Sequence, residues 1–386
     1  MCVVSCRNKA AAGMIHRRPL GADVYTVPNT VGLSQPDDVD AKNYETTDVS
    51  SRPLMETAPA APSLSVIVCT YNRASFLPGC LASLRAAGVP DLEIVVVDDG
   101  STDDTRQVIE KLNGPDVRYI HQENKGLSTA RNTGILASTG RYIAYLDSDD
   151  YWLPGVAADL VTFLDNHPDV GVVFTDAKVG NPDEGYKSWA AWAGRVEFTA
   201  LPATLDGPFR IFDRTAFYRL LIRRNLVFTG AVLQRRELVI GAGLFDAALN
   251  AAGDWELYLR MAARATFAFH PGELAIYTFH DGQMTKDTDR MVREFCDVRR
   301  AHMSRVAVAP AEQAILKETL KAESVYYAYK AYAREDYSTA RERFRQVLRE
   351  SGWDAKTAAY WLLSSLPAPL TRGVRWVGRR LAGQRG

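Results

Sequence analysis

Short apolar runs alternate with amphipathic stretches throughout residues 65–146, and this alternation constrains the fold more than any other feature of the chain. The strands that it predicts are residues 65–69, 92–97, 117–121 and 141–146. The helices predicted between them are residues 76–86, 105–112 and 126–137. Strands joined by short connections and a crossover helix form parallel pairs with right-handed crossovers. The sequence therefore predicts an α/β fold, Rossmann-like, with a mostly parallel sheet.

Polar side chains follow three of these predicted strands. They are Tyr71 and Asn72 after the first strand, Asp98 and Asp99 after the second, and Asp147, Asp149 and Asp150 after the fourth. In open α/β sheets, ligands bind in the crevice at the carboxyl ends of the strands. Two carboxylates one residue apart repel each other unless a cation lies between them, and oxygen ligands suit magnesium or manganese. The pattern predicts a ligand site with a divalent metal at this edge.

Each acidic cluster alone has a simpler explanation. A lone D-x-D triplet is often a solvated turn, and Asp98-Asp99 is also typical of charge stabilisation at a helix N-terminus, worth ~0.3–1 kcal/mol. Three clusters on successive strand ends of one sheet favour the ligand site. There, Asp99 can accept the N–H groups of a uracil or guanine base, and Tyr71 can stack on that base.

The first strand–helix turn excludes two common nucleotide motifs. Its sequence, CTYNRAS, contains no glycine, whereas a dinucleotide fold requires G-x-G-x-x-G at that turn. The chain also lacks the G-x-x-x-x-G-K-[ST] phosphate loop. The ligand is therefore expected to be a nucleotide held by acids and aromatic groups.

Composition narrows the class of protein. The 46 basic and 46 acidic residues cancel, which predicts no nucleic acid or other polyanion as partner. Five cysteines without a C-x-x-C pair argue against a disulfide framework or a zinc site. No apolar run reaches the ~20 residues needed to span a bilayer, and the first 18 residues do not resemble a signal peptide. These features predict a soluble, cytoplasmic protein.

The chain divides into three predicted segments. Residues 1–62 lack sustained periodicity and are expected to be a largely disordered segment that ends in a linker. Residues 63–305 hold the α/β domain. Residues 306–386 form a helical appendage, with helices expected at residues 312–334, 337–350 and 355–365. The first two resemble a single tetratricopeptide-like hairpin, which implies no repeat array.

The last residues combine basic and apolar side chains. Leu370, Val374, Val377 and Leu381 share one helical face, arginines lie off it, and no acid follows Thr371. A basic amphipathic helix is typical of a peripheral membrane anchor. A solvated helix packed on its own protein explains the pattern equally well, so contact with the inner face of the cell membrane stays open.

Four motifs in a fixed order give the chain a family resemblance. SVIVCTYNR, EIVVVDDGSTDDT, HQENKGLSTARNTGI and GRYIAYLDSDDYW resemble glycosyltransferase family 2, the inverting GT-A nucleotide-sugar transferases. The likeness runs from about residue 65 to about residue 265. This chain has Cys69 where many members have a proline. The resemblance implies a GT-A fold, a nucleotide-sugar donor and a divalent metal.

The resemblance also implies roles for individual residues. Asp99 would hold the base, and Tyr71 would flank it. Asp147 would lie near the ribose or the metal, and Asp149 would contact the metal. The remaining residues expected to bind the donor are Thr70, Asn72 and Ser148, together with Lys125 and Arg131, either of which would neutralise the diphosphate or reach the base pocket.

His280 and Asp254 have more than one interpretation. His280 follows an apolar run, where relatives show a Tyr-x-x-His motif, and would be a metal ligand or a diphosphate contact, although a lone histidine is more often structural. Asp254 opens an amphipathic helix, where an ordinary N-cap is the simpler explanation. The family places its general base there, so Asp254, rather than its neighbour Glu256, is predicted to take the proton of the acceptor hydroxyl.

The segment between the acids and Asp254 is expected to face the acceptor. Residues 170–177 predict a fifth strand, and Thr229 and Gly230 are candidates to line the acceptor site. The intervening loop carries five aromatic residues, for which core packing is favoured over sugar binding: Trp189, Trp192, Phe198, Phe209 and Phe212.

Together these features predict an inverting, metal-dependent glycosyltransferase. It would move one sugar from a nucleotide diphosphate to a glycan or lipid-linked acceptor, in surface polysaccharide assembly. The segment from Arg372 to Trp376 lacks the glutamine of the Q-x-x-R-W motif, which favours single transfers over processive polymerisation. Two alternatives stay open: a nucleotidyltransferase of related fold, and a non-catalytic nucleotide- or glycan-binding module.

Overall fold

The computed structural model describes residues 62–112, 114–181, 183, 185–192, 200–280, 283 and 288–367. The prediction of disorder before Pro62 and that of a basic helix from Leu370 onward concern residues outside these ranges. No described helix is long and apolar enough to cross a membrane.

The first half of the chain forms the parallel part of the sheet. Its strands are β1 (Leu64–Thr70), β2 (Leu92–Asp98), β3 (Val117–His121) and β4 (Tyr142–Asp147), in the order β3-β2-β1-β4. The crossover helices are α1 (Leu77–Ala86), α2 (Thr105–Leu112) and α3 (Leu127–Ala137). All seven elements lie within one residue of their predicted bounds. The predicted α/β fold with a parallel core is confirmed.

The second half of the sheet is mixed. β10 (Val232–Arg235) pairs antiparallel with both β4 and β6 (Val170–Asn181), and β11 (Thr266–Thr278) pairs parallel with β6. β6 and β11 therefore run in the same direction as β4. The predicted fifth strand is the start of β6. The smaller strands are β5 (Tyr151–Trp152), β7 (Gly185–Ser188), β8 (Ala203–Asp206) and β9 (Phe209–Phe212).

Each face of the sheet carries its own apolar core, because successive residues of a strand point to opposite faces. Val66 and Val68 of β1 pack in one core with side chains of α1 and of α4 (Ala157–Asn166). Ile67 packs in the other with side chains of α3. The remaining helices are α5 (Trp189–Trp192), α6 (Arg214–Leu221), the 3-10 helix η3 (Thr229–Ala231), α7 (Arg236–Gly241) and α8 (Gly253–Ala262).

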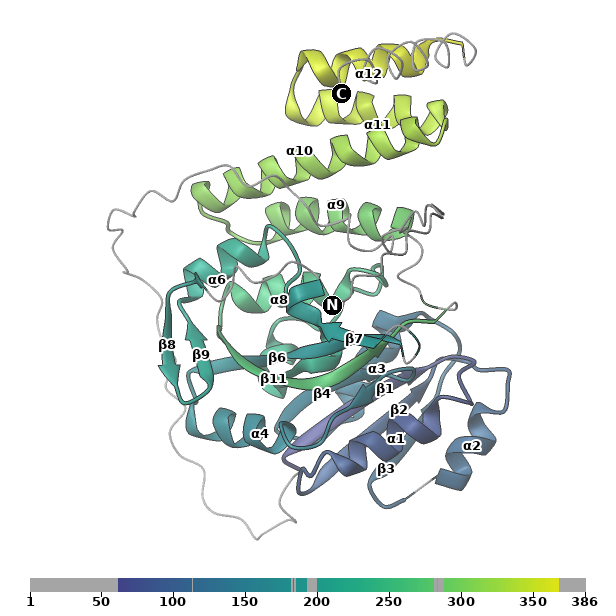
Figure 1. The fold of residues 1–386 in the computed structure, drawn as a ribbon, viewed down its shortest axis with the longest axis vertical. Helices are drawn as coiled ribbons and strands as arrows, with labels where there is room; N and C mark the ends of the chain where they lie inside the picture. Colours follow the sequence, from purple (N-terminus) through teal and green to yellow (C-terminus); the bar gives the residue numbers. More distant parts are fainter. Residues whose placement is uncertain are drawn as a thin grey trace, which may run out of the picture.

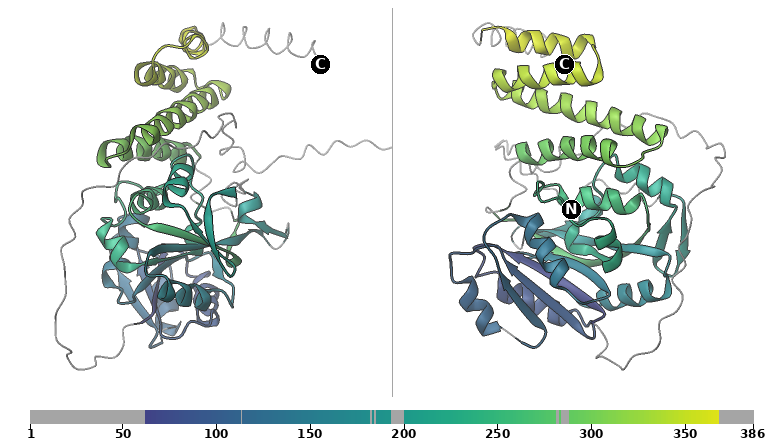
Figure 2. Two further views of the ribbon diagram at one scale, coloured as in Figure 1. Left: turned by 90° about the vertical axis from the view of Figure 1, so that its left-hand side faces the viewer. Right: turned by 180° about the vertical axis from the view of Figure 1, so that it is seen from behind.

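Four helices stack at one end of the molecule (Figure 1, Figure 2). They are α9 (Thr288–Arg305), α10 (Pro310–Ala333), α11 (Tyr337–Ser351) and α12 (Ala355–Ser365), the last three within two residues of their predicted bounds. Asp336 and Asp354 accept the N–H groups that open α11 and α12. Leu316 of α10 is fully buried in the core that also holds α3 and α8.

The strand register brings the predicted site residues to one edge. Thr70 pairs with Asp98 between β1 and β2, and Cys69 pairs with Asp147 between β1 and β4. Because β6 and β11 run in the same direction as β4, their carboxyl ends lie at this edge too.

Candidate active site

The loop after β1 is tied to the loop after β2. Asn72 adopts a left-handed backbone conformation, with φ of 53°. Its side-chain oxygen accepts the N–H of Thr102, and its own N–H donates to the Ser101 hydroxyl. Tyr71, beside it, is 47% exposed, so its ring is available to a ligand. Within the described residues the buried Thr70 hydroxyl has no hydrogen-bond partner.

Asp99 is buried among hydrogen-bond donors. One carboxylate oxygen accepts from the Gln122 side chain and from the N–H of Lys125, and the other accepts the N–H of Gly126 at 2.8 Å. The positive φ of 86° at Gly126 turns the chain into α3 at this point. Asp99 is therefore fixed in place, with acceptor capacity left on the second oxygen.

Arg131 is a buried cation that interacts with acids from two different segments of the chain. It is 5% exposed and donates to Asp147 at 2.9 Å. Burial works against the charged guanidinium, but the charges of Asp147, Cys69 and Asp254 raise the pKa of Arg131 above its ordinary value. Asp147 and Asp254 therefore both lie within electrostatic reach of one buried cation. Lys125, the alternative diphosphate contact, is exposed at the start of the same segment.

Asp149 and His280 meet although 131 positions separate them. Nε2 of His280 lies 2.7 Å from Oδ2 of Asp149. Nη1 of Arg73 lies 2.7 Å from the same oxygen and 3.0 Å from the same nitrogen. Sequence reasoning gave Arg73 no role. Its position directly after Asn72, at the carboxyl end of β1, is the signal that would have indicated it.

Asp150 and Ser148 are buried beside this pair. Asp150 accepts the N–H of Thr278 at 3.2 Å, which joins the acidic turn to the end of β11. Burial, together with the charges of Asp147 and Asp149, holds the pKa of Asp150 well above its ordinary value.

A divalent metal fits this pair of residues in part. Asp149 and His280 offer an oxygen and a nitrogen 2.7 Å apart. Across the described residues, no group of three or more histidine, cysteine, aspartate or glutamate side chains could hold a metal ion. A cation that bridges a diphosphate needs only one or two protein ligands. The donor set therefore suits a metal that arrives with a nucleotide diphosphate.

Asp254 lies in the first turn of α8, and Ala252 is the N-cap residue. Its Oδ2 accepts from the Thr229 hydroxyl at 2.7 Å and from the Asn225 side chain at 3.1 Å. The alternative that Asp254 is the N-cap is therefore wrong. Glu256, by contrast, is buried and paired with Arg260 at 2.6 Å.

The aromatic residues of the acceptor-facing segment separate into two groups. Phe209 and Phe212 are buried, as core packing requires. Trp189 is half-buried and lies 5.2 Å, between ring centroids, from Phe228. Phe198 and the side chain of Trp192 lie outside the described part of the chain.

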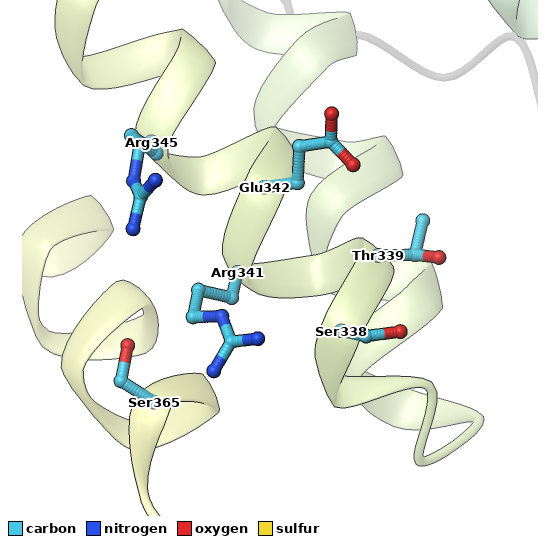
Figure 3. Close-up of a pocket in the computed structure, with 6 residues that line it drawn as sticks. All are labelled: Ser338, Thr339, Arg341, Glu342, Arg345 and Ser365. Carbon is cyan, nitrogen blue, oxygen red and sulfur yellow. The ribbon is translucent and has the colours of Figure 1, made fainter.

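A cavity of about 560 Å³ lies elsewhere, on the C-terminal helices. Figure 3 shows Arg341 and Arg345 of α11 projecting on the side of Ser365, while Glu342 points away. None of the predicted site residues lines it.

Comparison with known proteins assigns part of the chain to a family. Residues 65–227 match the family described as Glycosyl transferase family 2. The matched segment belongs to this family. Among relatives of the chain, EpsH of Bacillus subtilis is 37% identical over 162 residues, 41% of this chain and 47% of EpsH. Chondroitin synthase of Pasteurella multocida is 35% identical over 165 residues, 41% of this chain and 17% of that protein. The chain thus spans less than half of either relative.

Two solved structures share the GT-A fold of this chain. TarS 1-349 of S. aureus in complex with UDP-GlcNAc has a TM-score of 0.58 and 20% identity, covering 81% of this chain and 87% of that one. The mannosyltransferase PcManGT of Pyrobaculum calidifontis, in complex with GDP-Man and Mn²⁺, has a TM-score of 0.51 and 17% identity, covering 82% and 87%.

Proposed function

We propose that this chain transfers a single sugar, with inversion, from a nucleotide-diphosphate sugar to an acceptor hydroxyl. The observation that carries the proposal is the position of Asp254, which Thr229 and Asn225 orient within electrostatic reach of Arg131, the buried cation that also donates to Asp147. A direct displacement needs a base for the acceptor hydroxyl. It also needs a cationic, metal-binding group for the departing diphosphate. Glu256, paired with Arg260, is not available as the base.

Each side chain has a part in the proposed reaction. Asp99 and Tyr71 hold the base of the nucleotide, and Arg131 neutralises negative charge beside Asp147. Asp254 accepts the proton of the acceptor hydroxyl as its oxygen attacks the anomeric carbon and the nucleoside diphosphate leaves. A divalent metal held by Asp149 and His280 would supply Lewis-acid stabilisation of the departing diphosphate. One carboxylate base suffices, because no covalent glycosyl intermediate forms.

The acceptor is proposed to be a glycan or a lipid-linked glycan in surface polysaccharide assembly. Two relatives are named chondroitin synthase and hyaluronan synthase. Phe228, next to Thr229, lies 5.4 Å from Tyr277, which lies 5.7 Å from Phe279 (ring centroids). Trp189 and Phe228 also pack against the apolar core, so the part of these half-buried rings that stays exposed is what would suit a sugar face near Thr229.

The test is incubation of the protein with UDP- and GDP-sugars and Mn²⁺. Release of nucleoside diphosphate supports glycosyl transfer, whereas release of pyrophosphate indicates a nucleotidyltransferase. Asp254→Asn should keep donor binding and lose at least about 100-fold in transfer rate, the usual contribution of a general base. Glu256→Gln is the matched control, because it changes the neighbouring acid and should keep the rate per folded molecule. Full activity of Asp254→Asn contradicts the assignment.

Metal dependence is tested separately. Chelation with EDTA should abolish transfer, and Mn²⁺ or Mg²⁺ should restore it. Asp149→Ala should lose metal-dependent donor binding, measured as the thermal stabilisation that a nucleotide sugar gives the native state. Equal stabilisation of Asp149→Ala and the unaltered protein rules out Asp149 as the ligand.

A further inference from the structure

Arg73 is the strongest candidate for a role beyond those proposed so far. It extends from the loop after β1, and its guanidinium reaches an acid 76 positions away on the loop after β4. Its side chain is 22% exposed, and that of Asp149 is 16% exposed. The two charges of a pair shielded to this extent attract each other more strongly than those of a fully exposed surface ion pair do.

The contacts of Arg73 coincide with the proposed metal ligands. A single nitrogen, Nη1, lies 2.7 Å from Oδ2 of Asp149 and 3.0 Å from Nε2 of His280. These are the same two atoms that lie 2.7 Å from each other. A cation bound to that oxygen and that nitrogen competes with Nη1 for their lone pairs, and the positive charge of the guanidinium repels it.

The ring of Phe76 contacts both Arg73 and His280. The guanidinium carbon of Arg73 lies 5.5 Å from the centroid of the Phe76 ring, within the range of a cation–π contact. The same ring lies 5.3 Å from the imidazole of His280. The contacts with Phe76 and Asp149 thus hold the guanidinium next to both proposed metal ligands.

We propose that Arg73 is an internal counter-cation that competes with the divalent metal for Asp149 and His280. The inference rests on the proposed function, because it takes these two residues as the metal ligands. A metal that binds has to displace the guanidinium, which then needs new acceptors. The oxygens of a nucleoside diphosphate are such acceptors, since arginine pairs well with phosphate. Metal binding should therefore be weak alone and strengthened by the nucleotide.

Titration with Mn²⁺, followed by electron paramagnetic resonance of the free ion, tests this without any turnover. The full-length protein is titrated alone and with UDP or GDP present. Arg73→Gln should bind Mn²⁺ about tenfold more tightly than the unaltered protein when no nucleotide is present, because Asp149 loses its competing partner. The nucleotide should strengthen Mn²⁺ binding less in this variant than in the unaltered protein.

Three further variants make the result specific. Arg73→Lys keeps a positive charge and should stay within about threefold of the unaltered protein. Arg73→Met also removes the charge but keeps an aliphatic contact with Phe76. It should tighten Mn²⁺ binding as Arg73→Gln does, and it replaces Arg73→Gln in the test if the latter folds poorly. Arg85→Gln is the matched control, because it breaks a 2.7 Å ion pair with Asp116 at the other edge of the sheet. It should not change Mn²⁺ binding.

The outcomes separate the two proposals. If Asp149→Ala abolishes Mn²⁺ binding but neither Arg73→Gln nor Arg73→Met tightens it, Arg73 does not compete and this inference is wrong. If Asp149→Ala leaves Mn²⁺ binding unchanged, the metal assignment in the proposed function fails. Tighter binding in both neutral variants, lost again when Asp149→Ala is added, supports both.

Discussion

The hydroxyl of Thr229 donates to Oδ2 of Asp254 over 2.7 Å and orients the proposed base from a different segment of the chain. Thr229 opens η3, which leads into β10, whereas Asp254 lies in the first turn of α8. The acid is therefore positioned by η3, the turn that leads into the strand next to β4.

Thr229→Val should slow transfer without weakening donor binding. The substitution removes one hydrogen bond to Asp254 and leaves that from Asn225, so we expect a rate loss of about tenfold, or about 1.4 kcal/mol. Steady-state kinetics with the donor varied would measure it, with the Michaelis constant for the donor unchanged. Thr229→Ser keeps the hydroxyl and is the control. A full rate in Thr229→Val shows that Asp254 is oriented without Thr229.

Glu294 of α9 should be needed for the geometry of α8. One oxygen of this 8% exposed side chain accepts the N–H groups of Asn250, Ala251 and Ala252, at 3.0, 2.6 and 2.9 Å. Glu294→Ala leaves these donors without their acceptor, so we expect a loss of about 3 kcal/mol in the free energy of unfolding. Urea denaturation would measure it.

The same substitution should affect transfer more than donor binding, because the loop that Glu294 holds leads directly into Asp254. Glu294→Gln keeps an acceptor oxygen of the same reach, and we expect it to recover most of the stability and rate. If both variants transfer sugar at the original rate, the loop before α8 keeps its conformation without α9.

His302 should make the protein sensitive to acid. Burial, with a smaller contribution from the charge of Arg260, lowers the pKa of His302 to about 4, and its Nε2 lies 2.6 Å from the Tyr218 hydroxyl. The unfolded chain takes up the proton near pH 6.5, whereas the native state does not until about pH 4. The contribution of His302 to the free energy of unfolding is therefore fully present above pH 6.5. It decreases by about 3 kcal/mol as the pH falls to about 4.

Urea denaturation at several pH values between 4 and 7 would measure this decrease. In His302→Gln, the slope of the free energy of unfolding against pH over this interval should correspond to about one fewer proton taken up on unfolding. We expect this variant to be less stable at pH 7. An unchanged slope would mean that other groups account for the acid sensitivity.

Gly134→Ala should destabilise the fold by overpacking. A Cβ at this position would lie 2.5 Å from Cγ2 of Ile67, because α3 packs closely against β1. We expect a cost of about 1–3 kcal/mol in thermal or urea unfolding. Gly241→Ala, at the end of α7, is the matched control. A Cβ there meets nothing within 4 Å, so stability should stay the same or rise by up to about 1 kcal/mol.

The parallel half of the fold was predictable because its signals are local. Residues 94–97 are buried on both faces of the sheet and form a continuous apolar run, which few structures other than a central strand can accommodate. The short connections then left one handedness for each crossover.

The mixed half was not predictable in the same way. β10 has only four residues, and β11 contains Pro271-Gly272 and shifts register against β6 around this point. Their pairing depends on contacts between distant segments, which leave no periodic pattern. The same reason explains Arg73: its ion pair with Asp149 exists only once β1 and β4 lie side by side.

The C-terminal helices have a practical consequence for anyone who wants a smaller protein. Arg299 lies 4.5 Å above the Trp255 ring, next to Asp254, and its charge is met by Glu323 and its Nε by the Thr319 hydroxyl, both on α10. Cutting the chain after Arg305 would leave this buried guanidinium without Glu323, in contact with the residue that follows the proposed base. A minimal catalytic unit therefore has to retain α10, and trimming should begin no earlier than α11.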